Sequence, residues 1–272
     1  MVERDGLWEY EVKEDGTIRI LSYCDDPYTL EVPETINGRT VTALGDYCFS
    51  PDEEYVDSDI SDLRANFTTI VLPNTITEIG EGCFMRGNLY SINIPGGVKE
   101  IKERTFDDCY NLNKVTLNEG LEDIGCAAFY SCESLTTINI PSTVKKIEDG
   151  AFDSCENLEE FILPSSLEEI GDGVFNSCPG LVEIPPSVKK IGTEDGLFYN
   201  CENLKSVTIP DGVESFYGFE CCYNLESVTI PESVTEISDD TFEDCEELTI
   251  YGKKGSYAET YANDKDIPFK EI

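Results

Sequence analysis

The stretch that decides the fold runs from Leu135 to Cys155 and reads Leu-Thr-Thr-Ile-Asn-Ile-Pro-Ser-Thr-Val-Lys-Lys-Ile-Glu-Asp-Gly-Ala-Phe-Asp-Ser-Cys. Its pattern, L-x-x-I-x-I-P-x-x-V-x-x-I-x-x-x-A-F-x-x-C, recurs along the chain at a spacing of 23 residues, as from Cys132 to Cys155. Two columns of the repeat can be read directly: Phe49, Phe84, Phe106, Phe129, Phe152, Phe175, Phe198, Phe219 and Phe242, and Cys109, Cys132, Cys155, Cys178, Cys201, Cys222 and Cys245. Such regularity identifies a repeat protein.

A unit of this length cannot bury its own apolar side, so the units must stack and bury Leu, Ile, Val and Phe against one another. The alternation at Ile138-x-Ile140 predicts a strand, and Pro141 ends its pairing. The Gly- and Asp-rich stretch before Ala151-Phe152 predicts a short helical or 3₁₀ turn. We therefore expect an α/β solenoid with one long parallel β-sheet and short turns on its other side.

The L-x-x-I-x-I-P-x-x-V-x-x-I-G-x-x-A-F-x-x-C spacing, which extends from about Leu30 to Ile250, resembles the BspA-type leucine-rich repeats of bacterial surface proteins. The resemblance implies a right-handed leucine-rich-repeat solenoid, horseshoe-shaped or gently curved. It also implies adhesion or protein binding at the cell surface, and it brings no catalytic residues with it.

We expect one domain in three parts. Residues 1–29 form an N-terminal β-hairpin cap around a turn at Asp15-Gly16, because a solenoid needs its terminal apolar layers covered. Residues 30–250 hold about nine repeats, with an acidic insertion at 50–66. The strand at Leu181–Pro185 lacks two residues of the pattern, and we expect a local irregularity there rather than a break.

Residues 251–272 form the C-terminal helical cap. Ser256 is placed to N-cap a helix, and Ile267-Pro268-Phe269 reads as a closing extended segment. The spacing of four residues predicts the inner face of this helix: Tyr257, Ala258, Tyr261 and Ala262.

The charge of the chain excludes several classes of function. Its 272 residues include 19 Lys and Arg, 56 Asp and Glu and no His, for a net charge of −37. A field of this sign repels phosphate, so we expect no nucleic-acid partner and no binding to anionic membranes. The absence of His removes the commonest general base and metal ligand. We expect no cofactor.

The termini and the apolar runs bear on location. No run of 18 apolar residues occurs, so we expect no membrane insertion. The first residues, Met1–Asp5, do not begin the apolar core of a signal peptide. Given the resemblance, we expect an extracellular or cell-surface protein whose signal peptide and anchor lie outside this chain. A cytoplasmic location stays open.

The cysteine column has two interpretations. A metal or redox array would need ligands that converge, and the sequence has no C-x-x-C pair and no His. We favour buried, free thiols that fill a small slot beside each Phe, since thiols stacked in parallel have the wrong geometry for disulfides.

The acidic insertion imitates the start of a calcium loop at Asp57-x-Asp59-x-Ser61. It has Asp62 where such a loop needs Gly, and Thr68 where it needs Glu. We favour a solvated loop and no metal. A weak calcium site at Asp57, Asp59 and Asp62 is the alternative.

Charged pairs alternate in sign between Val and Ile of successive repeats: Glu122-Asp123, Lys145-Lys146, Glu168-Glu169 and Lys189-Lys190. Stacked coils would place acidic beside basic side chains, which specifies the register. A binding stripe is the alternative.

The outward-facing strand positions are the candidate partner-binding surface. They carry small polar side chains and few anchors of the kind that dominate protein interfaces. The candidates are Thr137, Asn139, Glu160, Ile162, Ser206 and Thr208, with Tyr55 in the insertion. Four further tyrosines lie in the turns, where they either pack or contact a partner: Tyr110, Tyr130, Tyr199 and Tyr223.

We therefore expect a monomeric, non-catalytic module that binds or adheres to a host or bacterial surface protein. One alternative is a structural scaffold or surface-layer component. The other is a carbohydrate-active enzyme that uses two carboxylates, which needs no His but does need a raised carboxyl pKa in a cleft.

Overall fold

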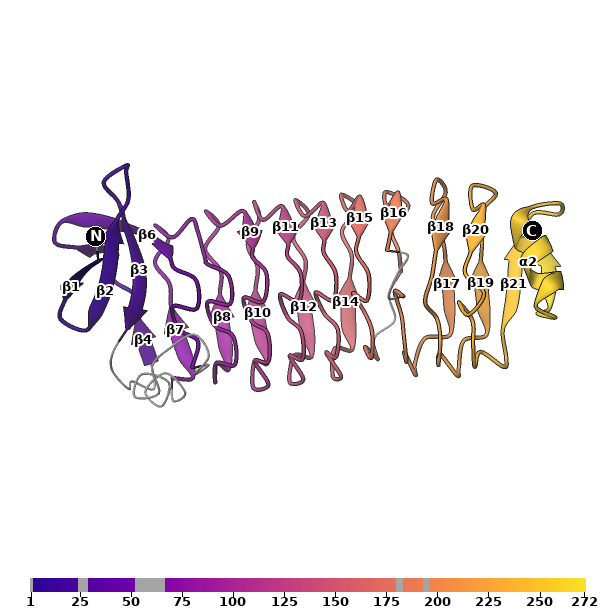
Figure 1. Cartoon of the computed structure of the whole chain (residues 1–272), viewed down its shortest axis with the longest axis horizontal. Helices are drawn as coiled ribbons and strands as arrows, with labels where there is room; N and C mark the ends of the chain where they lie inside the picture. The colour runs from indigo at the N-terminus through magenta and orange to yellow at the C-terminus, as the bar shows by residue number, and fades with distance from the viewer. Residues whose placement is uncertain (1, 24–28, 52–66, 180–182, 193–195) are drawn as a thin grey trace.

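The computed structural model describes residues 2–23, 29–51, 67–179, 183–192 and 196–272. It is a β-solenoid in which successive coils stack along a straight axis (Figure 1). One side of the stack is a long parallel sheet in which Lys114 lies opposite Thr137 of the next coil. The strands of this sheet are β4 (Thr29–Glu31), β7 (Thr69–Val71), β8 (Ser91–Asn93), β10 (Lys114–Thr116), β12 (Thr137–Asn139) and β14 (Glu160–Ile162), followed by β17 (Ser206–Thr208), β19 (Ser227–Thr229) and β21 (Thr249–Gly252).

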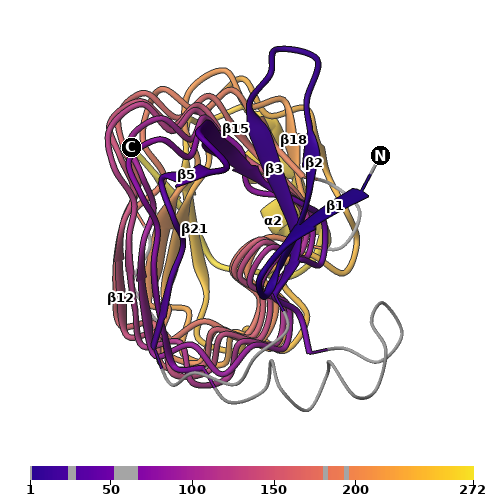
Figure 2. The ribbon, with the colours of Figure 1, turned by 90° about the vertical axis from the view of Figure 1, so that its left-hand side faces the viewer.

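The predicted repeat solenoid is confirmed, but it has a second parallel sheet that the sequence did not predict. The second sheet occupies another side of each coil (Figure 2). It forms because the residues of each Val-x-x-Ile segment are extended and pair with the same segment of the next coil. Its strands are β9 (Glu100–Ile101), β11 (Asp123–Ile124), β13 (Lys146–Ile147), β15 (Glu169–Ile170) and β16 (Lys190–Ile191), then β18 (Ser215–Phe216) and β20 (Glu236–Ile237).

The third side of each coil is a ladder of tight turns, which keep the i to i+3 bonds of the expected 3₁₀ turn but do not form a continuous helix. Within one coil, the Asp107 N–H donates to the Arg104 carbonyl at 3.1 Å. The neighbouring Phe106 and Asp108 N–H groups instead donate to Ala128 and Tyr130 of the next coil, at 2.8 and 2.9 Å. Because every second N–H leaves its coil, a continuous helical ladder cannot form here.

Phenylalanine rings fill the interior. Phe106, Phe129 and Phe152 stack with centroids 5.1 and 5.2 Å apart and with nearly parallel planes. Phe161, which replaces the usual aliphatic residue on the inner side of β14, contacts Phe152 and Phe175 edge-on. The core is therefore one continuous column along the solenoid axis.

The N-terminal cap contains the predicted hairpin. Strands β2 (Trp8–Val12) and β3 (Ile18–Tyr23) pair antiparallel, with a bulge between Glu9 and Tyr10. The hairpin is extended by β1 (Val2–Asp5) on one side and by β6 (Arg39–Leu44) and β5 (Thr35–Ile36) on the other. Since β3 and β6 run parallel, the cap continues into the first coil.

The C-terminal cap contains the predicted helix, α2 (Tyr257–Asp264), and the closing strand β22 (Phe269–Glu271), which pairs with β21. Two details of the prediction are wrong. The Ser256 side chain makes no capping hydrogen bond; Glu259 instead accepts the Gly255 N–H at 2.6 Å. Tyr257 is exposed, whereas the rest of the predicted inner face is buried: Ala258, Tyr261 and Ala262.

Both sheets are interrupted at the same level of the stack. Among the described residues, β14 pairs with β12 alone, β17 with β19 alone, and β16 with β15 alone. The turn ladder is continuous, since the Leu197 and Phe198 N–H groups donate to Tyr217 and Gly218. Among the described residues, the expected irregularity is therefore seen in the pairing of the two sheets, whereas the turn ladder runs through this level.

Candidate functional site

Five of the predicted partner-binding residues lie on the outward side of the long sheet: Thr137, Asn139, Ile162, Ser206 and Thr208. Thr137 and Asn139 are exposed on either side of the buried Ile138, as strand alternation requires. Ser206 and Thr208 have the same arrangement on β17. Glu160 is the first residue of β14 and Ile162 is the last. Tyr55, Asp57, Asp59 and Asp62 lie outside the described residues.

Ile162 differs from the other candidates because it is a large apolar side chain that is 76% exposed. It borders a groove of about 440 Å³, which Leu163 and the segment Glu183–Pro186 also line. We call this groove the notch. It lies where Glu183–Pro186 is outside any strand, in the coil whose strand segment lacks two residues of the pattern.

The sequence predicted Ile162 only as one member of a row and did not predict the notch. The signal for it was present, because the shortened strand segment at Leu181–Pro185 directly follows the coil of Ile162. A missing pair of strand residues leaves the neighbouring strand uncovered on the sheet surface.

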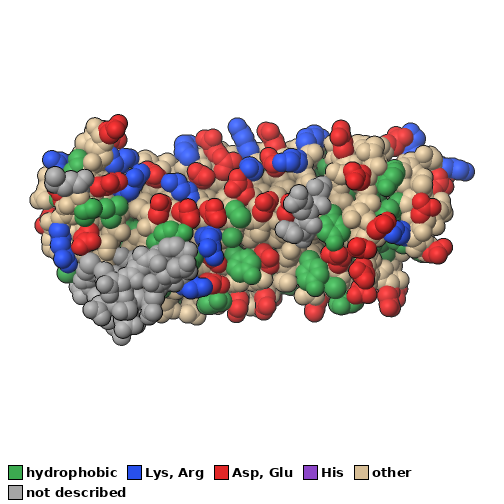
Figure 3. Space-filling model, in the orientation of Figure 1, with side chains coloured by type: hydrophobic (Ala, Val, Ile, Leu, Met, Phe, Trp, Pro, Cys, Tyr) green, Lys and Arg blue, Asp and Glu red, His purple; other side chains and the backbone are tan. Residues whose placement is uncertain are grey.

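The alternating charges on the second sheet stack in the predicted register. Lys146 lies between Asp123 and Glu169, and Glu169 lies between Lys146 and Lys190. Lys190 forms an ion pair with Glu169, whereas Lys146 pairs with Glu148 of its own coil at 2.7 Å, which raises the pKa of Lys146. Figure 3 shows basic and acidic side chains intermingled along the upper edge of the solenoid. Charges that partner each other favour a role in register.

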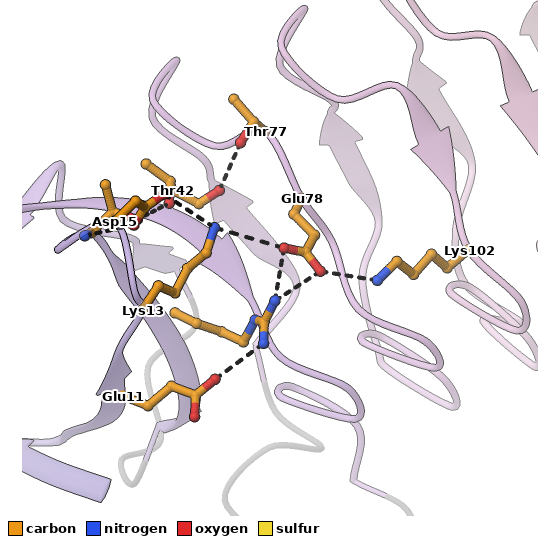
Figure 4. Close-up of polar contacts among 9 residues, drawn as sticks. Glu11, Lys13, Asp15, Thr42, Thr77, Glu78 and Lys102 are labelled. Atoms are coloured by element: carbon orange, nitrogen blue, oxygen red, sulfur yellow. Dashed lines mark hydrogen bonds and ion pairs between the residues drawn. The ribbon is translucent and has the colours of Figure 1, made fainter. Parts of the chain in front are cut away.

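A cluster of charges that sequence reasoning missed joins the N-terminal cap to the solenoid. The Arg19 guanidinium donates to both carboxylate oxygens of Glu78, at 2.9 and 2.8 Å, and Lys102 donates to Glu78 at 3.0 Å (Figure 4). Glu11 accepts a second bond from Arg19 at 3.0 Å. Burial raises the pKa of Glu78, but the bonds from Arg19 and Lys102 outweigh it and leave the pKa lowered.

We expect Glu78→Gln to destabilise the protein by about 1.5 kcal/mol, because it leaves the Arg19 guanidinium without its carboxylate. A carboxyl whose folded pKa is lowered stabilises the fold above its unfolded pKa, here 4.5, and loses this contribution as the pH falls through the folded pKa. Urea unfolding at pH 7 and at pH 3 measures both effects. The gap between wild type and variant should be smaller at pH 3 than at pH 7; a constant gap would contradict the ion-pair explanation.

The cysteine column consists of free thiols wherever the structure describes it. Each thiol also has a hydrogen-bonding role that the sequence did not predict: Cys132 and Cys155 donate to the carbonyls of Phe106 and Phe129, both at 3.2 Å. Burial raises the pKa of both thiols. In the described ranges, no three Cys, Asp or Glu side chains gather as metal ligands.

In the native protein we expect the buried thiols, such as Cys132 and Cys155, to react slowly with a thiol reagent, because a buried thiol of raised pKa holds little thiolate. In the denatured, non-reduced protein all 12 thiols should react with the reagent. A chromogenic disulfide reagent measures the rate of reaction in the native protein and, in guanidinium, the number of thiols in the denatured protein. Recovery of half the thiols or fewer would indicate disulfides instead.

The turn tyrosines are all partly exposed, with exposed fractions of 48% for Tyr110, 38% for Tyr130, 45% for Tyr199 and 52% for Tyr223. The Tyr110 hydroxyl donates to Asp108 at 2.8 Å, and this bond raises its pKa to about 12. Their exposure leaves them available to a partner.

No helix in the described part of the chain has the length and apolarity to cross a membrane.

Comparison with solved structures shows the same fold. The chain is similar to the pneumococcal vaccine antigen PcpA, with 16% identity, a TM-score of 0.59, and coverage of 100% of this chain and 98% of that one. It is also similar to a leucine-rich repeat protein from Bacteroides ovatus, with 21% identity, a TM-score of 0.52 and coverage of 99% of both chains. The chain has no match among curated proteins.

The family comparison covers most of the repeats. Residues 61–182 and 181–252 match the BspA type leucine rich repeat region in 6 copies. These ranges include the whole Cys column, the Phe column from Phe84 onward, the long sheet from β7 onward and the second sheet. The chain therefore belongs to the BspA-type leucine-rich repeat family.

Proposed function

We propose that this chain is a non-catalytic protein-binding module of a bacterial cell-surface or secreted protein, and that it binds its partner on the outward side of the long sheet. The observation that carries the proposal is the notch beside Ile162, whose side chain is 76% exposed on a surface of small polar residues. An exposed apolar side chain at the edge of a groove is typical of an interaction site.

The surroundings of the notch fit an interface. Thr137 and Asn139 on one side and Ser206 and Thr208 on the other supply exposed hydroxyl and amide groups. Protein interfaces commonly combine an apolar centre with a polar rim of this kind. Membership of the BspA-type leucine-rich repeat family supports a location at the bacterial cell surface.

The carbohydrate-enzyme alternative has less support. Burial raises the pKa of Asp107, Asp123 and Asp153, but these residues lie in the turn ladder and on the second sheet. Glu183 is the single carboxylate among the described residues that line the notch. A two-carboxylate mechanism needs a second acid across the cleft.

A peptide-display library tests the proposal without a known partner. Peptides selected on the wild-type protein should bind Ile162→Asp about tenfold more weakly or worse, because the apolar contact is replaced by a charge. Ser227→Asp adds the same charge to the same side of the sheet on β19 and should leave binding within about twofold. Equal binding to all three proteins would reject the notch as the site.

The scaffold alternative predicts self-assembly, whereas we propose a monomer. Light scattering during size exclusion should give a mass near 30.3 kDa for the chain. A larger particle, together with a library that yields no binder, would favour the scaffold.

A further inference from the structure

The last coils differ from the rest of the stack in how their charge is balanced. Residues 206–252 contain no Lys or Arg and twelve acids: Asp211, Glu214, Glu220, Glu226, Glu232, Glu236, Asp239, Asp240, Glu243, Asp244, Glu246 and Glu247. On the side that carries the turns, red and green side chains lie together over these coils (Figure 3). Lys253 and Lys265 of the C-terminal cap pair with Glu232 and Asp239, and among the described residues the other ten acids form no ion pair.

Two exposed tyrosines lie at this unbalanced region: Tyr223 is inside it, and Tyr199 belongs to the coil before it. The Cys221 side chain lies beside the phenols of both Tyr199 and Tyr223, and it raises the pKa of each. Its sulfur is 3.9 Å from a carboxylate oxygen of Asp244 in the next coil. Tyr199, Cys221, Tyr223 and Asp244 therefore form one surface, which we call the tyrosine patch.

The ladder of turns adds two more acids to the edge of the patch. The Asn200 N–H donates to the Glu220 carbonyl at 2.9 Å, and the Cys221 N–H donates to the Glu243 carbonyl at 3.1 Å. Glu243 and Asp244 are exposed, and neither forms an ion pair within the described part of the chain.

The same turn positions in two coils nearer the N-terminus carry an arginine beside an aspartate. Arg86 and Asp108 occupy the same left-handed position of successive coils, with φ of 57° for both, as do Cys221 and Asp244 with φ of 59° and 63°. The Arg86 guanidinium lies 3.3 Å from Asp108, which also accepts the Tyr110 hydroxyl. At the tyrosine patch, Cys221 stands where Arg86 would be, so Asp244 has a tyrosine nearby but no arginine.

We propose that the tyrosine patch binds an arginine side chain from a basic segment of a protein partner, which takes the place that Arg86 occupies beside Asp108. A guanidinium can stack on a phenol ring while it bonds to a carboxylate, and Arg is favoured over Lys for both contacts. The field of the surrounding acids attracts a basic segment and repels an acidic one. This site is separate from the notch and does not depend on it.

The probe is a fluorescein-labelled Gly-Arg-Gly-Arg-Gly peptide, measured by fluorescence anisotropy at physiological salt. A matched peptide with citrulline in place of arginine has the same shape without the charge. We expect the arginine peptide to bind the wild-type protein at least about tenfold more tightly than the citrulline peptide, because the citrulline peptide lacks the desolvated cation contact. Equal affinity for the two peptides would overturn the proposal.

Variants separate the patch from the general charge of the protein. Cys221→Arg should occupy the site with a side chain of the protein itself and weaken binding of the arginine peptide about tenfold. Ser154→Arg places the same charge at the same left-handed position of a distant coil. It should change binding of the peptide about twofold or less. Tyr223→Ala should lose binding that Tyr223→Phe retains, because the ring is the contact. These exposed substitutions also test the site if Cys221→Arg fails to fold.

The opposite results reject the proposal. If Ser154→Arg weakens binding as much as Cys221→Arg, or if Tyr223→Ala binds as wild type does, the peptide is held by net charge alone. Ile162→Asp should leave the arginine peptide bound, so failure of the notch and failure of the tyrosine patch are distinguishable.

Discussion

Replacing Gly171 with Ala should destabilise the solenoid by about 3 kcal/mol, at the upper end of what overpacking costs. A Cβ at this position would lie 2.5 Å from the Asp149 nitrogen and 2.8 Å from the Glu148 carbonyl carbon, both backbone atoms of the preceding coil. It would also lie 2.3 Å from the Asp149 Oδ1, which accepts the Asp172 N–H at 2.9 Å. The two coils would have to separate, and the bond between them would be lost.

Gly150→Ala is the matched control. A Cβ there meets nothing within 4 Å, so the cost comes only from its φ of 60°, about 1 kcal/mol. Urea unfolding followed by far-UV circular dichroism measures both variants. Equal losses for the two would show that contact between coils is not what requires glycine at 171.

The second large effect is expected for Phe129→Ala, which should destabilise the protein by about 4 kcal/mol. Phe129 is fully buried between Phe106 and Phe152, and truncation opens a cavity that two rigid stacked rings cannot fill. Because each coil contacts only its neighbours, the gap also weakens the coupling between the two halves of the stack. We expect the unfolding transition to broaden, with a lower apparent m-value.

Tyr130→Ala removes the adjacent ring on the surface and should change stability by about 0.5 kcal/mol or less, since its side chain is 38% exposed. Calorimetry and urea unfolding on both variants give the comparison. A loss below about 1.5 kcal/mol for Phe129→Ala would mean that the coil collapses around the cavity.

Much of the fold could be predicted because it depends on periodicity. The Phe and Cys columns, the strand at Ile138-x-Ile140 and the hairpin around Asp15-Gly16 repeat or follow simple local rules, and each is found in the structure. The second sheet was missed because two extended residues per coil are too few for an alternation signal. They become a strand only when the next coil supplies a partner.

The turn segment shows the same limit. Its i to i+3 bonds alone indicate a short helix, but Phe106 and Asp108 donate to the next coil instead. The competition between these two bonding patterns depends on the distance between coils, which no local sequence specifies. Ser256 lies at the N-cap, but its side chain makes no capping hydrogen bond, because the residue type alone does not set the direction of its side chain.

The candidate site was only partly predictable. Alternation correctly placed Thr137, Asn139 and Ile162 on the outside of the sheet, but the notch needed the position of Glu183–Pro186 in space. The cluster of Arg19 with Glu78 joins residues 59 positions apart, and neither belongs to a motif.

The sequence by itself therefore determined the repeat, the stacking direction of the apolar columns, the caps and the excess of acid, because each is a local or periodic property. The tertiary structure alone decided which charges are neutralised. Lys190 and Lys146 on the second sheet and Arg19 in the N-terminal cap pair with carboxylates. Asp244 and the exposed tyrosines of the last coils have no such neighbour among the described bases, because Cys221 takes the position that Arg86 fills elsewhere.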